Sequence, residues 1–400
     1  RGVQIRSIIE RISSSLVNAF KPNRGEGEIT RAKNYSDLGV IDESFDEIQH
    51  QSSKSFTKIR SLVKQPVLLG VLLTLFISLL YSRNRFGSLS GGALAVAPAS
   101  AFEMISSFVS SWHLVGLGSS AAAPAWIPII GIGSFITAAN PQTFITALFF
   151  LTPTLLFILS YRAARKYSLT KYSSVFVAFM YSFSPAVLTA INQGRLGTVV
   201  VAILLPSLFT LLEKNKGLGN LTWRKIFSIV LIASVAAAFS PLFLLSWIIF
   251  HSSVFLYNYF ISPNWRAIKW QEILKNLDTD EYKKRLALIF TPIFINVPIS
   301  INLILNPFSA LKEPGLTVES AGQLSVLLFN LGGLGSPPLF LLAPFVLYLI
   351  VAVISKEQRK VGITSLLVIS IAATLSSYFI EGNSSSAQRI WSGPLVIFAQ

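Results

Sequence analysis

Long apolar runs recur along this chain and restrict its fold more than any other feature. Nine runs approach the length of about 20 residues with which a helix crosses a bilayer, and a tenth starts near Leu395. Charged residues make up 13% of the 400 residues, about half their share in soluble domains. The sequence therefore predicts an all-α polytopic membrane protein with about ten transmembrane helices. The nine predicted spans are Val67–Tyr81, Phe144–Tyr161, Ser173–Ile191, Thr198–Leu212, Ile226–Ser240, Leu242–Tyr259, Leu286–Leu305, Leu339–Ile354 and Ile363–Phe379.

The positive charge of the chain indicates how these spans are oriented. The formal net charge is +15, and basic residues gather in four connectors between runs: Arg162–Lys171, Glu213–Lys225, Asn264–Arg285 and Lys356–Lys360. Basic connectors are typical of the cytoplasmic side, where they face anionic lipid. We therefore expect a multi-pass plasma-membrane protein with membrane lipids as partners. Because the cations are scattered between apolar runs, no nucleic-acid partner is expected.

Residues 1–63 differ from the rest of the chain. Isoleucines at helical spacing near the start alternate with Arg6 and Arg11, which predicts a basic amphipathic helix. Such a helix lies on the membrane surface or forms a solvated linker, and both alternatives stay open. We expect two regions, a cytoplasmic helix and linker over 1–63 and a polytopic membrane domain over 64–400. Arg1 at the start and an apolar run interrupted by Gln400 suggest a fragment of a longer chain.

One apolar segment does not fit the alternation of inside and outside. Pro124–Ala138 is short and contains proline and glycine. As a full span it would place the basic connector at 162–171 outside. We therefore expect a half-membrane or interfacial segment, whose backbone must be satisfied by protein or water.

The segment Gly91–Trp126 carries the first candidate site residues. It is rich in glycine, alanine and serine, and we expect a structured external loop. Its Glu103 is the only carboxylate between Val67 and Pro206. A lone acid there can act as a general base on an acceptor hydroxyl, and Ser100 to Glu103 also matches a helix capping box. The neighbouring pair, Trp112 and His113, offers a sugar-stacking ring and a second acid–base group.

Two further turns carry arginines at predicted outer membrane boundaries. Arg195 stands in the sequence INQGRLGT and Arg389 in QRIWSGP. An arginine can bind a phosphate through two parallel hydrogen bonds, or it can extend from the membrane toward the interface. Asn192 and Gln193 add hydrogen-bonding groups suited to sugars. Trp391 adds a second aromatic ring.

These motifs carry a family resemblance. The run GGAL followed by WHLVGLGS, together with NQGRLGT and QRIWSGP, resembles the membrane region of actinobacterial cell-envelope glycosyltransferases. In that family a family-2-type transferase domain often precedes a membrane region similar to the GT-C class, which uses polyprenyl-phosphate sugars. The resemblance covers most of Val67–Gln400. It implies a catalytic acid in the first external loop, at Glu103, and phosphate contacts at Arg195 and Arg389.

The favoured function is therefore transfer of a sugar from a polyprenyl-phosphate donor to a cell-envelope glycan on the outer face. The expected partners are a lipid-linked sugar donor and a glycan acceptor. No cofactor is indicated, and a divalent metal stays open, although no second histidine or acid near His113 suggests a metal site. The alternatives are a transporter or flippase for lipid-linked sugars and a non-catalytic membrane platform for an upstream transferase domain. Nearly charge-free spans argue against an ion-coupled pump.

Overall fold

A computed structural model gives the fold and describes residues 65–83, 87, 89–113, 118, 120, 123–211, 218–256, 280–297, 299–311, 321–332, 337–355, 358–381 and 387–400. The chain divides into two units, Arg1–Ser61 and Leu62–Gln400, and all described residues lie in the second. The helix and linker predicted over 1–63 therefore lie outside the described residues.

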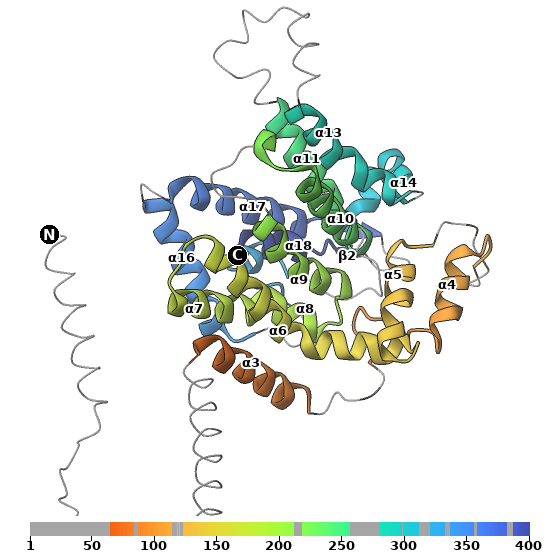
Figure 1. The fold of residues 1–400 in the computed structure, drawn as a ribbon, viewed down its shortest axis with the longest axis horizontal. Helices are drawn as coiled ribbons and strands as arrows, with labels where there is room; N and C mark the ends of the chain where they lie inside the picture. Colours follow the sequence, from red (N-terminus) through yellow and green to blue (C-terminus); the bar gives the residue numbers. More distant parts are fainter. Residues whose placement is uncertain are drawn as a thin grey trace, which may run out of the picture. The chain divides into compact units, whose positions relative to one another are not determined.

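The described part of the chain is mostly helical, as the apolar runs predict (Figure 1). One short antiparallel ladder, in which Phe379 pairs with Arg389, joins strands β1 and β2. The helices are α3 Pro66–Ser82, α4 Ala101–Val109, α5 Trp126–Gly133, α6 Pro141–Lys166, α7 Lys171–Ser182, α8 Pro185–Asn192, α9 Leu196–Leu211, α10 Trp223–Phe239, α11 Pro241–Leu256, α13 Asp280–Ile295, α14 Ile299–Leu305, α15 Gln323–Leu327, α16 Ala343–Ile354, α17 Arg359–Ser377 and α18 Gly393–Ala399. The 3-10 helices are η1 Ser134–Thr137, η2 Leu218–Asn220, η5 Pro307–Leu311 and η6 Leu339–Leu341, and the strands are β1 Phe379–Glu381 and β2 Ala387–Arg389.

Two helical stretches among the described residues are long and apolar enough to cross a membrane. They are α6, with 26 residues, and the stretch Lys171–Asn192 formed by α7 and α8, with 22 residues. A third such stretch results if α13 and α14, between which the chain bends by 106°, form one broken span. Most other predicted spans fall on shorter helices. The 17 residues of α3, for example, reach about 26 Å, a few ångströms less than the bilayer core. An arrangement of ten spans therefore remains a prediction.

A helix of a soluble protein buries its large apolar side chains, whereas α3 buries small residues and exposes the large apolar ones. Gly70, Thr74 and Ser78 are buried at four-residue spacing, and the ring of Phe157 on α6 would meet a Cβ atom at Gly70. The exposed face carries large apolar side chains, including Leu72 at 52% and Phe76 at 57%. Small residues at helix contacts with leucine and phenylalanine facing outward are typical of packing in lipid.

The helices share a basic end, which we define by Lys166, Lys171, Leu211, Trp223 and Asp280. Lys166 at the end of α6 donates to the Thr210 carbonyl near the end of α9. Trp223 at the start of α10 donates to Asp280 at the start of α13, with 3.0 Å between Nε1 and Oδ1. Four successive stretches, α6, α7 with α8, α9 and α10, therefore alternate in direction between the basic end and the opposite end.

The opposite end, the loop end, is defined by Ala93–Pro98, Asn140 and Asn192–Leu196. There α4 and α5 lie beside the start of α6 (Figure 1). The 12 residues Trp126–Thr137 reach about 20 Å, because α5 rises about 1.5 Å and η1 about 2 Å per residue. That is too short to cross a bilayer core of about 30 Å, so the helical part of Pro124–Ala138 agrees with the prediction of a partial segment.

Candidate functional site

A tight corner between α8 and α9 forms the centre of the loop end. Gly194 adopts φ +67°, which ends α8, and the Arg195 amide donates to the Ala190 carbonyl over 2.8 Å. This pattern is a glycine C-cap of the Schellman type. Because α9 begins at Leu196, the chain reverses within three residues. The NQGRLG sequence therefore encodes a helix reversal that holds its polar side chains at one point.

The GGAL sequence of the first loop docks on this corner. Gly91 and Leu94 exchange two backbone hydrogen bonds of 3.0 and 3.1 Å, and the Ala93 amide donates to the Gln193 carbonyl over 2.7 Å. Gly92 adopts φ +58°, and a Cβ atom there would lie 2.3 Å from that carbonyl oxygen. Only glycine fits this close approach without strain. Two motifs that are about 100 residues apart in the sequence thus meet through backbone contacts.

Arg195 and Trp391 pack against each other at the same corner. The Arg195 guanidinium lies 4.1 Å from the centre of the Trp391 ring, and the two residues are 5% and 4% exposed. The Trp391 Nε1 group donates to Thr198 Oγ1 over 2.8 Å. A buried cation over an indole face is a favourable contact, because the ring carries negative charge on its face. This contact joins the QRIWSGP segment to α9.

Gln193 connects the corner to a fourth segment. Its Nε2 group donates to the Gly332 carbonyl over 2.6 Å, and its Oε1 atom accepts a long contact of 3.4 Å from Arg195 Nε. Asn330 Oδ1 accepts from the Gly332 amide over 2.9 Å. Gln193 is 2% exposed, so its side chain forms these hydrogen bonds in the interior of the protein. We name Gln193, Arg195, Thr198 and Trp391 the corner cluster.

The structure therefore brings together three of the predicted site residues, Gln193, Arg195 and Trp391. Asn192 lies beside them at the end of α8, where its Oδ1 atom accepts from the Tyr81 hydroxyl over 2.5 Å. Arg389 lies two residues before Trp391, in β2. The contacts of Thr198 and Gly332 were not predicted, because nothing in an apolar run or a distant glycine marks them as partners.

The residues predicted on the first loop occupy a different place. Glu103 is exposed on α4, and its amide donates to the N-cap Ser100 Oγ over 3.1 Å. Among the described residues, no hydrogen bond or ion pair joins the Glu103 carboxylate to Arg195. Trp112 is 55% exposed and its ring lies against Gly118. His113 is half-buried.

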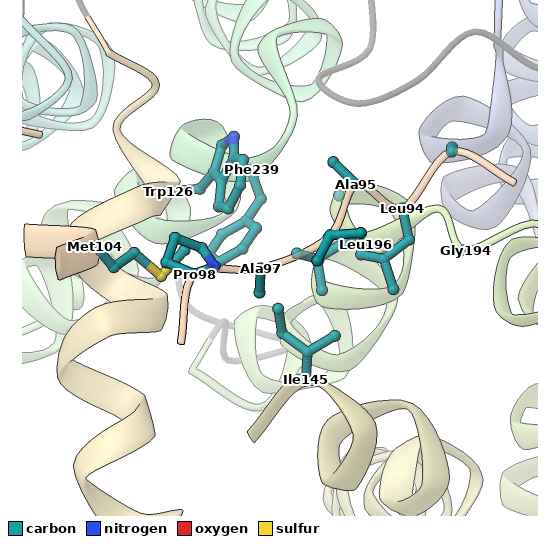
Figure 2. Close-up of a pocket in the computed structure, with 13 residues that line it drawn as sticks. Leu94, Ala95, Ala97, Pro98, Met104, Trp126, Ile145, Gly194, Leu196 and Phe239 are labelled. Atoms are coloured by element: carbon teal, nitrogen blue, oxygen red, sulfur yellow. The ribbon is translucent and has the colours of Figure 1, made fainter. Parts of the chain in front are cut away.

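An apolar pocket lies between the first loop and the corner. Its volume is about 70 Å³, and it is bounded by Ala93–Pro98 and by side chains of five helices. Figure 2 shows Trp126 and Phe239 close together near Pro98, with Leu94 and Leu196 across the cavity and Ile145 below them. The residue next to Glu103, Met104, also lines it. Among the residues that the structure describes, the buried Trp126 Nε1 group finds no hydrogen-bond partner. A cavity of about 150 Å³ holds benzene. This pocket has about half that volume, so it suits a smaller apolar group, of about the size of a short branched chain.

No group of three or more histidine, aspartate or glutamate residues gathers within the part of the chain that the structure describes. The described residues therefore offer no candidate set of ligands for a divalent metal.

Comparison with known proteins adds no relative to this picture. No protein-family model, curated protein or solved structure matches the chain.

Proposed function

We propose that the chain is a multi-pass protein of the plasma membrane. The arrangement of α3 supports this, because its exposed leucine and phenylalanine side chains would face water in a soluble protein. Two helical stretches of sufficient length and hydropathy support it as well. In this orientation the basic end faces the cytoplasm and the loop end faces the outside.

Within that orientation, we propose that the chain acts as the membrane part of a cell-envelope glycosyltransferase that uses a polyprenyl-phosphate sugar. One observation carries this proposal: Met104 of α4 lines the apolar pocket at the loop end, and Glu103, the residue before it on the same helix, is exposed. An apolar pocket and an exposed acid on one helix suit a substrate with an apolar tail and a sugar hydroxyl. Glu103 would accept the proton of the acceptor hydroxyl as the sugar is transferred.

The corner cluster has a positioning role in this proposal. Trp391 covers one face of the Arg195 guanidinium, and Gln193 bonds to Gly332. These contacts hold the corner in place. The first loop is bonded to the corner through the Ala93 amide and the Gln193 carbonyl, and the corner residues Gly194 and Leu196 line the pocket. Direct contacts of Arg195 and Arg389 with a phosphate, and of Trp112 and Trp391 with a sugar, stay predictions from the sequence.

The platform function remains the second candidate, because of a specific observation. The Glu103 amide completes the cap of its own helix, and an exposed acid in the first turn of a helix is favourable without any catalytic role. The two functions differ in what they require of the Glu103 side chain, so a substitution there separates them.

Replacing Glu103 by glutamine is expected to lower sugar transfer by about a factor of 100 to 10,000, the usual contribution of a general base. The substitution keeps the size of the side chain and the cap, which uses the backbone amide of Glu103. The measurement is transfer of radiolabelled sugar from polyprenyl-phosphate pentose and hexose donors by membranes that contain the chain.

The matched variant is Glu103→Asp, which keeps the acid and is expected to retain part of the activity. Equal expression and equal melting temperatures in detergent establish that both variants fold. Transfer by Glu103→Gln at the level of the unchanged chain would remove Glu103 as the base. Absence of transfer by the unchanged chain with every donor would favour the platform.

A further inference from the structure

The strongest feature outside the loop end is a charged and aromatic cluster at the basic end. Asp280 accepts from Trp223 Nε1 over 3.0 Å and forms an ion pair with Lys284. The Lys284 ammonium lies 5.8 Å from the centre of the Trp223 ring. The hydrogen bond from Lys284 lowers the pKa of Asp280. The carboxylate therefore stays charged and joins the starts of α10 and α13.

Basic residues exceed acidic residues in this cluster. The first two turns of α10 and of α13 carry five cations, at Arg224, Lys225, Lys283, Lys284 and Arg285, against two acids. Each acid already pairs with a cation one turn later, Asp280 with Lys284 and Glu281 with Arg285, the latter over 3.1 Å. Among the described residues of these two helix starts, cations therefore outnumber acids by three.

Arg224 is one of two exposed cations in this group, with Lys283. The Arg224 guanidinium has no hydrogen-bond or ion-pair partner among the residues that the structure describes. Arg224 follows Trp223, whose ring is 37% exposed. A free guanidinium beside an exposed indole at a membrane boundary suits a phosphate in the headgroup region, because arginine binds phosphate through paired hydrogen bonds.

An apolar stripe continues from this cluster along α10. Trp223, Phe227 and Leu231 recur at four-residue spacing, and Phe227 and Leu231 are 58% and 60% exposed. The stripe covers about 12 Å of helix at 1.5 Å per residue, most of the thickness of one leaflet of the hydrocarbon core. Positive charge at one end and an apolar stripe of that length match a lipid better than a soluble phosphate.

We propose that the start of α10, next to the net positive start of α13, binds one anionic phospholipid of the inner leaflet. The phosphate lies on Arg224 and an acyl chain lies along Phe227 and Leu231. The site is separate from the pocket at the loop end. The inference rests on the membrane location proposed above and is independent of transferase activity.

The test uses the full chain, purified in detergent and studied by native mass spectrometry. Dioleoyl phosphatidylglycerol and dioleoyl phosphatidylcholine are titrated separately, and inorganic phosphate is added as a competitor. Arg224→Gln is compared with Arg359→Gln, which removes an exposed arginine from the start of another helix, α17. Melting temperatures in detergent without phospholipid confirm that both variants fold.

We expect selective retention of phosphatidylglycerol by the unchanged chain and about fivefold weaker binding after Arg224→Gln, the effect of one basic residue near an anionic surface. Arg359→Gln is expected to leave the affinity within twofold. Equal losses in the two variants would show diffuse charge attraction and overturn the site. Equal binding of phosphatidylcholine, or displacement by millimolar inorganic phosphate, would overturn the lipid assignment. Solubility of the chain without detergent would instead contradict the membrane location.

Discussion

Replacing Trp391 by leucine is expected to lower the free energy of unfolding by about 3 kcal/mol, near the lower limit for loss of a buried aromatic side chain. The ring is 4% exposed, so its removal leaves a cavity. Thr198 Oγ1 also loses the indole donor at 2.8 Å, and the buried Arg195 guanidinium loses its aromatic partner. The measurement is the unfolding transition in detergent micelles, followed by circular dichroism and tryptophan fluorescence.

A double-mutant cycle isolates the contact between cation and ring. Arg195→Met is combined with Trp391→Leu, and we expect a coupling energy of about 2 kcal/mol for a desolvated pair. Trp112→Leu serves as the control, because that ring is 55% exposed and should cost less than about 1 kcal/mol. Additive effects of the two corner substitutions would contradict a direct Arg195–Trp391 interaction.

Replacing Gly92 by alanine is expected to release the first loop from the corner and to lower the free energy of unfolding of the protein by about 2 to 4 kcal/mol. The left-handed backbone costs an alanine about 1 to 2 kcal/mol. The new Cβ atom would also lie 2.3 Å from the Gln193 carbonyl oxygen, which is backbone and cannot rotate away. Hydrogen exchange of the Ala93 amide measures the release, because that amide donates to the same carbonyl.

Val96→Ala provides the control for this second prediction. Val96 lies in the same loop and is 71% exposed, so its truncation should change stability by less than about 0.5 kcal/mol. If Gly92→Ala leaves the protection of the Ala93 amide and the unfolding transition unchanged, the contact between the GGAL turn and Gln193 is wrong.

The sequence predicted the helices better than their ends and bends. The run Ser173–Ile191 was predicted as one span, and it forms α7 and α8 with a break before Pro185. Proline lacks the amide that would continue the helical ladder, so the break has a local cause. The span predicted at Leu286–Leu305 bends between α13 and α14. Hydropathy shows that both runs are apolar, but it says little about where the helix axis changes direction within a run.

The candidate site could be predicted in part. The motifs GGAL and NQGRLGT were singled out in the sequence, and they contain Gly92 and Gly194, whose positive φ angles favour glycine. The partner of Gln193, in contrast, is a backbone carbonyl 139 residues away, and no local pattern encodes such a contact. For Glu103 the sequence leaves two roles open. Its spacing from Ser100 fits a helix cap, and its position in the first loop fits a catalytic acid, so sequence pattern alone does not distinguish the two roles.

The contacts of Gln193 have a consequence for how the loop end orders. One residue joins the first loop through its carbonyl, the Gly332 segment through its amide group and Arg195 through its amide oxygen. Segments that share such a junction lose their order together rather than one by one. The three segments therefore behave as a cooperative unit, and a ligand that binds any one of them would stiffen the others.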